Sequence, residues 1–272
     1  MHLNCGPRAL LAFLPLLLAA CVPMTPHVDR AVVATLAPTG VLRLAIYRGS
    51  PISMVRDPAT GATKGVGQDL GREMAGALGV QPVLVECSNN AETVAAMKEG
   101  RADSIFTNAT PARATDIAFA PALLEMEQGY IVPPGSPLTS SDAVDSAGQR
   151  IGVLRGSTSE RELPRLIRSA TLVSVASLSE AAQRLSDRSL DAFATNKSIL
   201  YELADHLDGA MVLPGAYGRE SIAIGIPKER AVALPWVEGF GTTALNRGDV
   251  ARAVAGAGLR GAQVMSSGAA RR

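Results

Sequence analysis

The feature that most constrains the fold of this chain is a pair of similar segments far apart in the sequence. Residues 92–108 read ETVAAMKEGRADSIFTN, and residues 179–196 read SEAAQRLSDRSLDAFATN. Each copy predicts a helix, a tight turn and a strand of the form D-x-x-x-T-N. Two copies are too few for a solenoid, which stacks several shorter repeats into one continuous core. The chain is therefore predicted to fold as two similar lobes.

Short apolar runs alternate with helical repeats along the remainder of the chain. We predict strands at 41–46, 82–86, 103–107, 149–154, 171–175 and 190–194, and helices at 67–79, 90–99, 159–168, 179–186 and 196–207. Such alternation is typical of parallel sheets covered by helices, so the predicted fold class is α/β.

The composition is that of an ordinary globular protein. The chain has 272 residues, 47% of them hydrophobic, and its 26 basic side chains nearly equal its 25 acidic ones. A disordered chain would be less apolar and more highly charged, and proteins that bind nucleic acid usually carry a basic excess. Aromatic residues make up only 4% of the chain, which argues against recognition of stacked bases. We expect a monomer with no nucleic-acid partner.

The N-terminus has the pattern of an export signal. The apolar segment 9–20 is followed at once by Cys21, in the sequence LAAC. A spanning helix needs about 20 apolar residues, so the segment better fits the central region of a signal peptide. LAAC resembles the bacterial lipobox, so we expect residues 1–20 to be a lipoprotein signal peptide and Cys21 to be lipidated. A plain signal peptide cleaved nearby, with Cys21 incidental, is the alternative.

The segment after this cysteine predicts a tether. Residues 21–39 are rich in proline, threonine and small residues. Acyl chains hold a protein on a membrane without a spanning helix, which predicts a periplasmic, membrane-anchored lipoprotein; a soluble periplasmic protein is the alternative. We expect the folded part to begin at Gly40 and residues 265–272 to form a tail.

Few residues are available for metal or thiol chemistry. After export Cys87 is the one thiol left to the folded domain, while His27 lies in the predicted tether and His206 in a predicted helix. A reactive thiolate, a zinc site and a His-based triad each need partners close by. We expect no metal, no cofactor and no disulfide, and an inert, buried Cys87.

Five segments carry a resemblance to a known family. In chain order they are GVLRLAIYRGSPISM, GVGQDLGREMAGALGV, MKEGRADSIFTNATPAR, QRIGVLRGSTSE and SLDAFATN. As an ordered set they resemble family 3 of the bacterial extracellular solute-binding proteins, the receptors of polar amino acid ABC importers. The resemblance implies a periplasmic-binding-protein-like type II fold, whose two lobes close on a ligand by a hinge, and an ABC permease partner in the inner membrane. It places lobe 1 at 40–131 plus 221–264 and lobe 2 at 132–220.

Both copies of the repeat end in the same two polar residues. Thr107 and Asn108, like Thr195 and Asn196, fall at the carboxyl end of a predicted parallel strand, where ligands bind in open α/β sheets. If the lobes face each other, all four residues should border one cleft. Threonine and asparagine also cap the element that follows, and the two roles can coexist.

A site for an anion is predicted between the lobes. The sequence TPAR predicts a helix with Thr110 as N-cap, which places Arg113 in its first turn. The guanidinium fork suits a carboxylate, and the resemblance implies that Arg113 holds the carboxylate of the ligand; a surface arginine is the alternative. Ser157 and Thr158 open a predicted helix whose N–H groups and hydroxyls favour an anion. Simple capping of that helix is the competing role.

Other positions bear on the identity of the ligand. The resemblance implies that Tyr47 and Ser50, after the first strand, shape the pocket for the ligand's side chain. Asn196 stands where many family members have an aspartate that pairs with the ligand's ammonium, and the segment 103–113 is shorter than usual in the family. A zwitterion would lack its usual partner unless another acid substitutes for the aspartate. We therefore predict a small carboxylate, or an amino acid whose amine is held by carbonyls and amides.

Binding without turnover is the predicted function, as the substrate-binding lipoprotein of an ABC importer. The same fold is used by periplasmic dehydratases that act on cyclic carboxylates. Catalysis would need a positioned acid or base, and Glu125, Glu127 and Glu220, near the predicted crossings between lobes, are the candidates; surface or hinge pairing explains them as well. A sensory or scaffold lipoprotein without a ligand is a third alternative.

Overall fold

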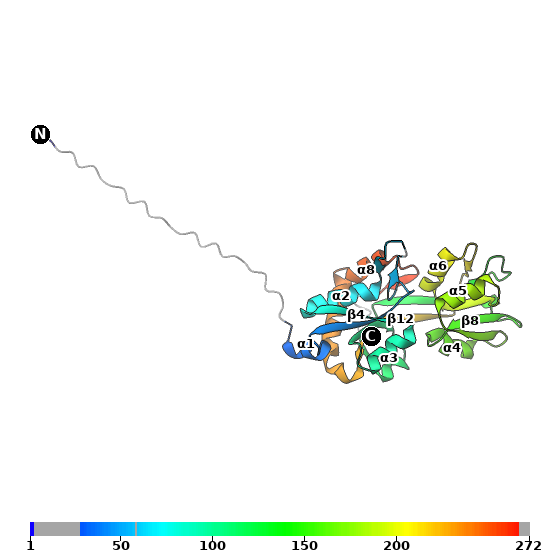
Figure 1. Cartoon of the computed structure of the whole chain (residues 1–272), viewed down its shortest axis with the longest axis horizontal. Coiled ribbons are helices and arrows are strands. Elements are labelled where there is room, and N and C mark those ends of the chain that lie inside the picture. The colour runs from blue at the N-terminus through cyan, green and yellow to red at the C-terminus, as the bar shows by residue number, and fades with distance from the viewer. Residues whose placement is uncertain (3–27, 58, 267–272) are drawn as a thin grey trace.

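Two α/β bodies joined by long strands make up the molecule. A computed structural model describes residues 1–2, 28–57 and 59–266. Figure 1 shows α2, α3 and α8 in one body, which we call lobe 1, and α4, α5 and α6 in the other, lobe 2. The predicted two-lobed α/β fold is thus confirmed.

The elements divide between the lobes as follows. Lobe 1 contains α1 (Arg30–Leu36), β1 (Val41–Tyr47), β2 (Val55–Arg56), β3 (Thr63–Lys64), α2 (Val66–Leu78), β4 (Gln81–Cys87), α3 (Asn90–Lys98), β5 (Ser104–Asn108), η1 (Arg113–Thr115), β6 (Ile117–Phe119), η3 (Lys228–Ala233), α7 (Leu234–Asn246), α8 (Asp249–Ala257) and β13 (Ala262–Val264). Lobe 2 contains η2 (Ser141–Ala143), β8 (Arg150–Leu154), α4 (Thr158–Leu166), β9 (Thr171–Val175), α5 (Leu178–Ser186), β10 (Ala192–Asn196), α6 (Lys197–His206) and β11 (Met211–Val212). The strands β7 (Leu124–Val132) and β12 (Gly218–Pro227) run through both lobes.

The two lobes have the same arrangement of strands, and the two arrangements meet at the middle of the main sheet. The main sheet runs β4-β1-β5-β12-β7-β10-β8-β9. In lobe 1 the parallel strands β4, β1 and β5 lie beside antiparallel β12, and in lobe 2 the parallel strands β9, β8 and β10 lie beside antiparallel β7. β7 and β12 also pair antiparallel to each other. Since three antiparallel steps separate β5 from β10, these strands run in opposite directions and their carboxyl ends converge.

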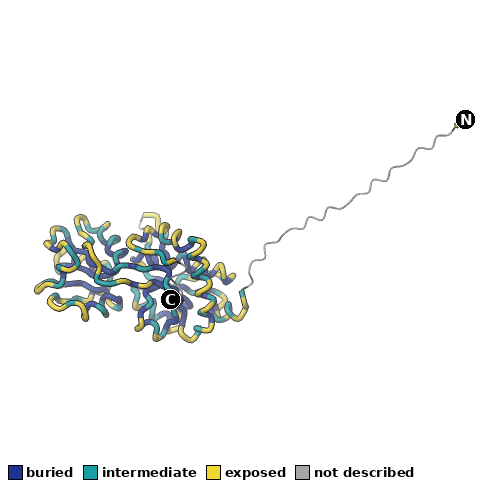
Figure 2. The backbone as a smooth tube through the Cα atoms, turned by 180° about the vertical axis from the view of Figure 1, so that it is seen from behind, coloured by how far each residue is buried: buried dark blue, intermediate teal, exposed yellow. Residues whose placement is uncertain are grey.

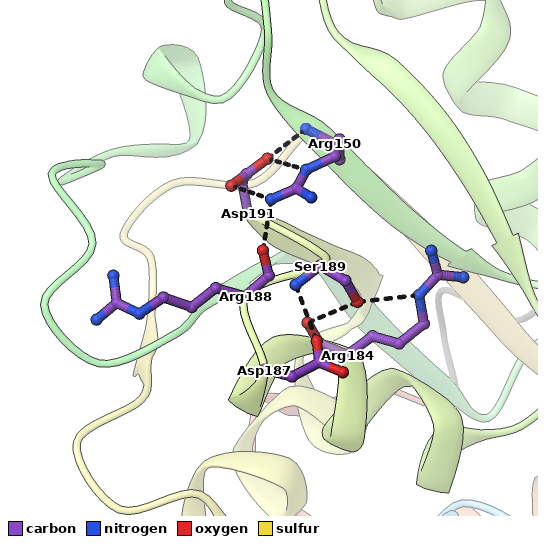
Figure 3. Close-up of polar contacts among 6 residues, drawn as sticks. All are labelled: Arg150, Arg184, Asp187, Arg188, Ser189 and Asp191. Carbon is purple, nitrogen blue, oxygen red and sulfur yellow. Dashed lines mark hydrogen bonds and ion pairs between the residues drawn. The ribbon is translucent and has the colours of Figure 1, made fainter.

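The same ion pair fixes the first and third strands of each lobe. In lobe 1 the backbone N and Nε of Arg43 donate to Asp103 Oδ2 at 2.9 and 2.8 Å, and its Nη2 donates to Oδ1 at 2.7 Å. In lobe 2 Arg150 makes the same three bonds to Asp191, at 2.8, 2.9 and 3.0 Å (Figure 3). The internal repeat is therefore a repeat of interactions as well as of sequence.

The turn between helix and strand also corresponds in the two lobes. Gly100 adopts a φ of +68°, and Arg188, at the matching position of the second copy, adopts +59°. A left-handed arginine is strained. Asp187 Oδ1 accepts from Ser189 N at 2.9 Å, and the Arg188 carbonyl accepts from Arg150 (Figure 3). These bonds hold the turn without a glycine.

Capping residues explain where three of the helices begin. In each helix the side chain of the N-cap residue, Asn or Ser, accepts from the backbone N–H of a glutamate three positions later. The carboxylate of that glutamate in turn accepts from the backbone N–H of the residue before the N-cap. The pairs are Asn89 with Glu92 for α3, Ser157 with Glu160 for α4, and Ser177 with Glu180 for α5.

Each lobe has its own hydrophobic core on both faces of its sheet. In lobe 1 the predicted apolar face of α2, with Leu70, Met74 and Leu78, packs in the larger cluster, and the opposite face holds a smaller one with Met97. Lobe 2 has two clusters of its own, one of them built around Phe193. Figure 2 shows buried backbone inside each body and exposed backbone around it.

The predicted tether extends too far along the chain. Asp29 Oδ1 accepts from Ala31 N at 2.8 Å and begins α1, whose Leu36 is fully buried against lobe 1. The expectation that the folded part starts at Gly40 is therefore wrong, because this apolar stretch packs on the core. Cys21 and all but the first two residues of the predicted signal peptide lie outside the described residues. In residues 28–57 and 59–266 no helix is long and apolar enough to cross a membrane.

At the other end, Met265 N donates to Leu123 O at 3.0 Å, so the predicted tail begins with a residue bonded to the domain.

The two matched ion pairs differ in burial, which predicts different energies. The Asp103 side chain is 0% exposed and also accepts from Arg230 at 2.6 Å, whereas that of Asp191 is 28% exposed. Burial alone would raise the pKa of Asp103, but hydrogen bonds from Arg43 and Arg230 hold that pKa below its usual value.

We expect Asp103→Ala to lower the free energy of unfolding at pH 7 by about 3–5 kcal/mol, because two half-buried arginines lose their counterion. Asp191→Ala should cost about 1 kcal/mol, because its pair is solvated. Urea unfolding measures both. A carboxyl with a lowered folded pKa stabilises above its unfolded pKa, so the cost of Asp103→Ala should shrink as the pH falls below about 4. Equal costs at pH 7 would contradict this account.

Candidate functional site

A cleft lies between the two lobes. Its lining comprises Tyr47, Ser50, Ile52, Asn90, Phe106, Thr107 and Asn108 from lobe 1, Leu154, Ser157, Thr158, Thr195, Asn196 and Ile199 from lobe 2, and Glu220 and Ile222 from β12. Both lobes and one of the crossing strands therefore contribute side chains to the same cleft.

The sheet topology explains why the two repeat copies meet here. Asn108 pairs with Ile222 of β12, and Asn196 pairs with Gln128 of β7. These partners lie at the two ends of the short ribbon that joins the lobes, in which 124–128 pairs with 218–222. The carboxyl ends of β5 and β10 therefore face each other across this ribbon. Of the predicted ligand-binding residues, all except Arg113 line the cleft.

Arg113 lies directly behind the lining. Its Nη1 donates to Thr107 Oγ1 and to Asn108 O, both at 3.0 Å, and the residue is only 4% exposed. Nη2 has no hydrogen-bond partner among the described residues. Burial lowers the pKa of Arg113 to about 10, so the group is charged at neutral pH. A buried cation with an unused donor is a place for an anion.

The TPAR segment forms a tighter turn than predicted. Thr110 Oγ1 accepts from Arg113 N at 3.3 Å, as an N-cap would, but Arg113–Thr115 is a 3₁₀ helix. The next strand, β6, begins at Ile117, which leaves no room for an α-helix. The predicted helix is therefore a single 3₁₀ turn, and Arg113 is buried rather than on the surface.

The lobes touch directly across the cleft. Asn108 Nδ2 donates to Thr158 Oγ1 at 3.0 Å, while Asn108 Oδ1 accepts from Ser221 N at 3.1 Å. Gly156 lies against Ala91 of α3, so close that a Cβ on Gly156 would be 2.5 Å from that of Ala91. Lobe closure therefore depends on a polar contact and on the absence of one side chain.

The beginning of α4 is more fully occupied than the sequence suggested. Ser157 Oγ accepts from Glu160 N at 3.1 Å, and Gly156 N donates to Glu160 Oε2 at 2.6 Å. The Ser157 hydroxyl therefore caps α4, which is the alternative to anion binding. Thr158 retains a hydroxyl in the cleft, where it accepts from Asn108.

Tyr47 and Ser50 contribute hydroxyls from lobe 1. Burial raises the pKa of Tyr47 to about 12, so its phenol keeps its proton. Ser50 is fully buried, and its Oγ has no hydrogen-bond partner of good geometry among the described residues. Both residues therefore offer hydrogen-bonding groups to the cleft.

The glutamates of the crossing strands point to opposite faces. In the antiparallel ribbon Glu127 lies opposite Arg219 and Glu125 opposite Ser221, while Glu220 lies opposite Met126. Because side chains alternate along a strand, Glu125 and Glu127 share a face with Arg219, and both form ion pairs with it. Glu220 lies on the other face and lines the cleft.

Glu220 is the residue whose position the sequence reasoning did not resolve. Its Oε1 accepts from Gln128 Nε2 at 3.1 Å and its Oε2 from Asn196 Nδ2 at 3.3 Å. Burial raises the pKa of Glu220, against the opposing effects of the Arg113 charge and of hydrogen bonds from Thr158 and Asn196. The one sequence feature that could have indicated its position is that Glu220 immediately precedes the apolar run SIAIGIP.

The described residues hold no group of three His, Cys, Asp or Glu side chains arranged for a metal ion. Cys87 is a buried free thiol, and burial raises its pKa. This keeps the thiol protonated and unreactive at neutral pH.

Comparison with known proteins identifies the family. The sequence profile of the bacterial extracellular solute-binding proteins, family 3, matches residues 42–253. The chain belongs to this family. No curated protein sequence matches the chain.

Solved structures share the fold at low sequence identity. One is the substrate-binding protein of an amino acid ABC transporter, with 19% identity, a TM-score of 0.71 and coverage of 79% of this chain and 97% of that one. Another is an amino acid ABC transporter substrate-binding protein from Streptococcus pneumoniae bound to L-arginine, with 17% identity, a TM-score of 0.73 and coverage of 85% and 99%. A third is an ancestral amino acid-binding protein described as a precursor of cyclohexadienyl dehydratase, with 20% identity, a TM-score of 0.71 and coverage of 82% and 97%. Together they support the periplasmic-binding-protein-like type II fold of this family member.

The contact between Gly156 and Ala91 yields a test of lobe closure. We expect Gly156→Ala to hold the lobes apart, because the new Cβ would be 2.5 Å from that of Ala91. Gly148→Ala is the matched control: Gly148 also has a positive φ, +88°, but no atom within 4 Å of the new Cβ. Small-angle X-ray scattering should give a larger radius of gyration for Gly156→Ala alone. The same radius for both variants and the unsubstituted protein would show that the contact does not form in solution.

Proposed function

We propose that this protein is an extracytoplasmic substrate-binding lipoprotein of an ABC importer, which binds a small carboxylate-bearing solute, an amino acid or related organic acid, between its lobes. The observation that carries the proposal is Arg113, buried directly behind the interlobe cleft with Nη2 unbonded among the described residues. A ligand carboxylate would supply the missing acceptor and the opposite charge.

The surrounding groups support capture of a ligand between the lobes. Tyr47 and Ser50 offer hydroxyls from lobe 1, and Thr158 offers one from lobe 2. A ligand that contacts both lobes favours their closed arrangement, since it binds that arrangement better than the open one. In an importer, an ABC permease would receive the closed form. Similar structures include a protein bound to L-arginine and an ancestral arginine-binding protein bound to glutamine.

A thermal-shift panel of amino acids, organic acids and phosphonates tests ligand binding. A ligand at 100 times its Kd should raise the melting temperature by about 5–10 °C. Arg113→Ala should weaken that ligand by at least about 100-fold, since each charge-assisted hydrogen bond contributes roughly 1.5–3 kcal/mol. Arg165→Ala, which removes an exposed arginine of α4, is the control and should change nothing.

Two results would count against the proposal. Undiminished affinity of Arg113→Ala would remove this residue from the site, and a flat panel would favour a scaffold role. Glu220 favours one alternative, because a buried carboxyl with a raised pKa in the cleft is suited to general acid chemistry. Incubation with cyclic carboxylates followed by product analysis distinguishes the two: recovery of unchanged ligand supports transport, and product formation supports a dehydratase.

Lipidation at Cys21 is the second part of the proposal, and it rests on the LAAC sequence after the apolar segment. Each buried methylene contributes about 0.8 kcal/mol, so two or three acyl chains would anchor the protein to a membrane. When the full chain is expressed in a bacterium, we expect the mature protein to partition into the detergent phase of Triton X-114. Cys21→Ser should move it to the aqueous phase, whereas the control Cys87→Ser should leave it with the detergent. Aqueous partitioning of the unsubstituted protein would instead support a plain signal peptide.

A further inference from the structure

The cleft contains one carboxyl group that a simple carboxylate ligand leaves unexplained. Glu220 lies at the middle of the ribbon that joins the lobes, opposite Met126, and is 7% exposed. It is the only acidic residue among the described residues that line the cleft. Its two oxygens accept from the amides of Gln128 and Asn196, and Thr158 also donates to the carboxyl, so every hydrogen-bond donor to Glu220 in the described part of the chain is neutral.

The side-chain oxygens of the two asparagines of the repeat each already accept a backbone N–H. Asn196 Oδ1 accepts from Ile199 N at 3.2 Å, at the start of α6, and its Nδ2 points its hydrogen at Glu220. Asn108 Oδ1 accepts from Ser221 N, and its Nδ2 donates to Thr158. The prediction that carbonyls and amides hold the ligand's amine would therefore have to use the second lone pair of these oxygens or other carbonyls. The carboxylate oxygens of Glu220 are stronger acceptors for an ammonium.

Charge balance in the buried site points in the same direction. Arg113 and Glu220 bring one positive and one negative charge to the closed cleft. A monocarboxylate would leave a net charge of −1 unless Glu220 took up a proton, and a buried unpaired charge is costly. A zwitterion with one carboxylate and one ammonium leaves the site neutral, with each charge opposite a partner.

We propose that Glu220 is the counterion for a cationic group of the ligand, so that the cleft takes a zwitterion with its carboxylate toward Arg113 and its ammonium against Glu220. This inference rests on the proposed function. The strand β12 of the hinge thus supplies the acid, and Asn196, through its Nδ2 bond, is a positioning residue for it.

The proposal fixes the sign of the pH dependence. The ionisable groups whose charges act on Glu220 are Arg113 from η1, Glu162 from α4, and Tyr47 and Tyr217, whose own pKa values are raised by burial. A ligand ammonium favours ionised Glu220, so binding releases the proton from those molecules in which Glu220 is protonated. The affinity for a zwitterion therefore rises with pH until Glu220 is fully ionised in the free protein. A ligand without a cation favours protonated Glu220, so its affinity falls as the pH rises.

The test compares matched pairs of ligands that differ only in ammonium against hydroxyl. The probes are the common L-amino acids and the 2-hydroxy acids with the same side chains, such as L-alanine with L-lactate and L-phenylalanine with L-phenyllactate. Titration calorimetry between pH 5 and 8, in two buffers of different ionisation enthalpy, measures affinity and proton transfer. We expect the amino acid of the best pair to bind at least about 100-fold more tightly and to release protons.

Substitutions of Glu220 assign the effect to this side chain. Glu220→Gln keeps the shape and should weaken the amino acid by at least about 100-fold, while the hydroxy acid binds as before or more tightly. Glu220→Asp keeps the charge one methylene further back and should recover part of the affinity and the pH dependence. Glu162→Gln is the control and should keep the proton release. Melting temperatures without ligand show whether each variant folds, and the ligand-pair comparison stands on the unsubstituted protein alone.

The outcomes separate this inference from the function on which it rests. If the hydroxy acid binds as well as the amino acid, or Glu220→Gln leaves amino acid affinity unchanged, the assignment of Glu220 is overturned. If Arg113→Ala still abolishes binding in that case, the proposed carboxylate site survives. If no member of either series binds, the assignment of Glu220 is overturned, and the wider panel of organic acids and phosphonates decides the proposed carboxylate site.

Discussion

The antiparallel pairing of β7 with β12 is the interaction on which the rest of this structure depends. Each lobe is a parallel unit whose strands end at one edge, and alone each would present half of a site. The ribbon that pairs 124–128 with 218–222 reverses one unit relative to the other. It therefore brings Asn108 and Asn196 to face each other and places Glu220 between them.

The two ionisable side chains at the cleft, Arg113 and Glu220, are buried and have neutral hydrogen-bond partners. Arg113 is held by Thr107 and by the carbonyl of Asn108, and Glu220 by two amides, so each charged group is oriented by neutral partners. Neutral partners satisfy hydrogen bonds without cancelling charge. This leaves both charges available to a ligand, which explains why a protein would tolerate them in a closed cleft.

The two lobes share the same arrangement of strands and ion pairs, but they differ in how deeply these are buried. The Arg43–Asp103 pair is buried and reinforced by Arg230, whereas the Arg150–Asp191 pair is open to solvent. Lobe 1 also carries α1, α7, α8 and the returning strand β13, which enlarge its core.

The sequence alone determined the α/β class, the two-lobed repeat, the four polar residues of the two D-x-x-x-T-N segments, and the approximate extents of the strands and helices that it predicted, because hydrophobic periodicity and capping are local properties. It gave no extents for the crossing strands β7 and β12. It misjudged 30–36 as tether and did not show that the helix after TPAR is a single 3₁₀ turn, since the packing of Leu36 and the distance to β6 are set by the rest of the chain. The role of Glu220 also needed the tertiary structure. Its sequence neighbours do not show which face of β12 looks into the cleft; that depends on the register with β7, which joins residues 92 positions apart.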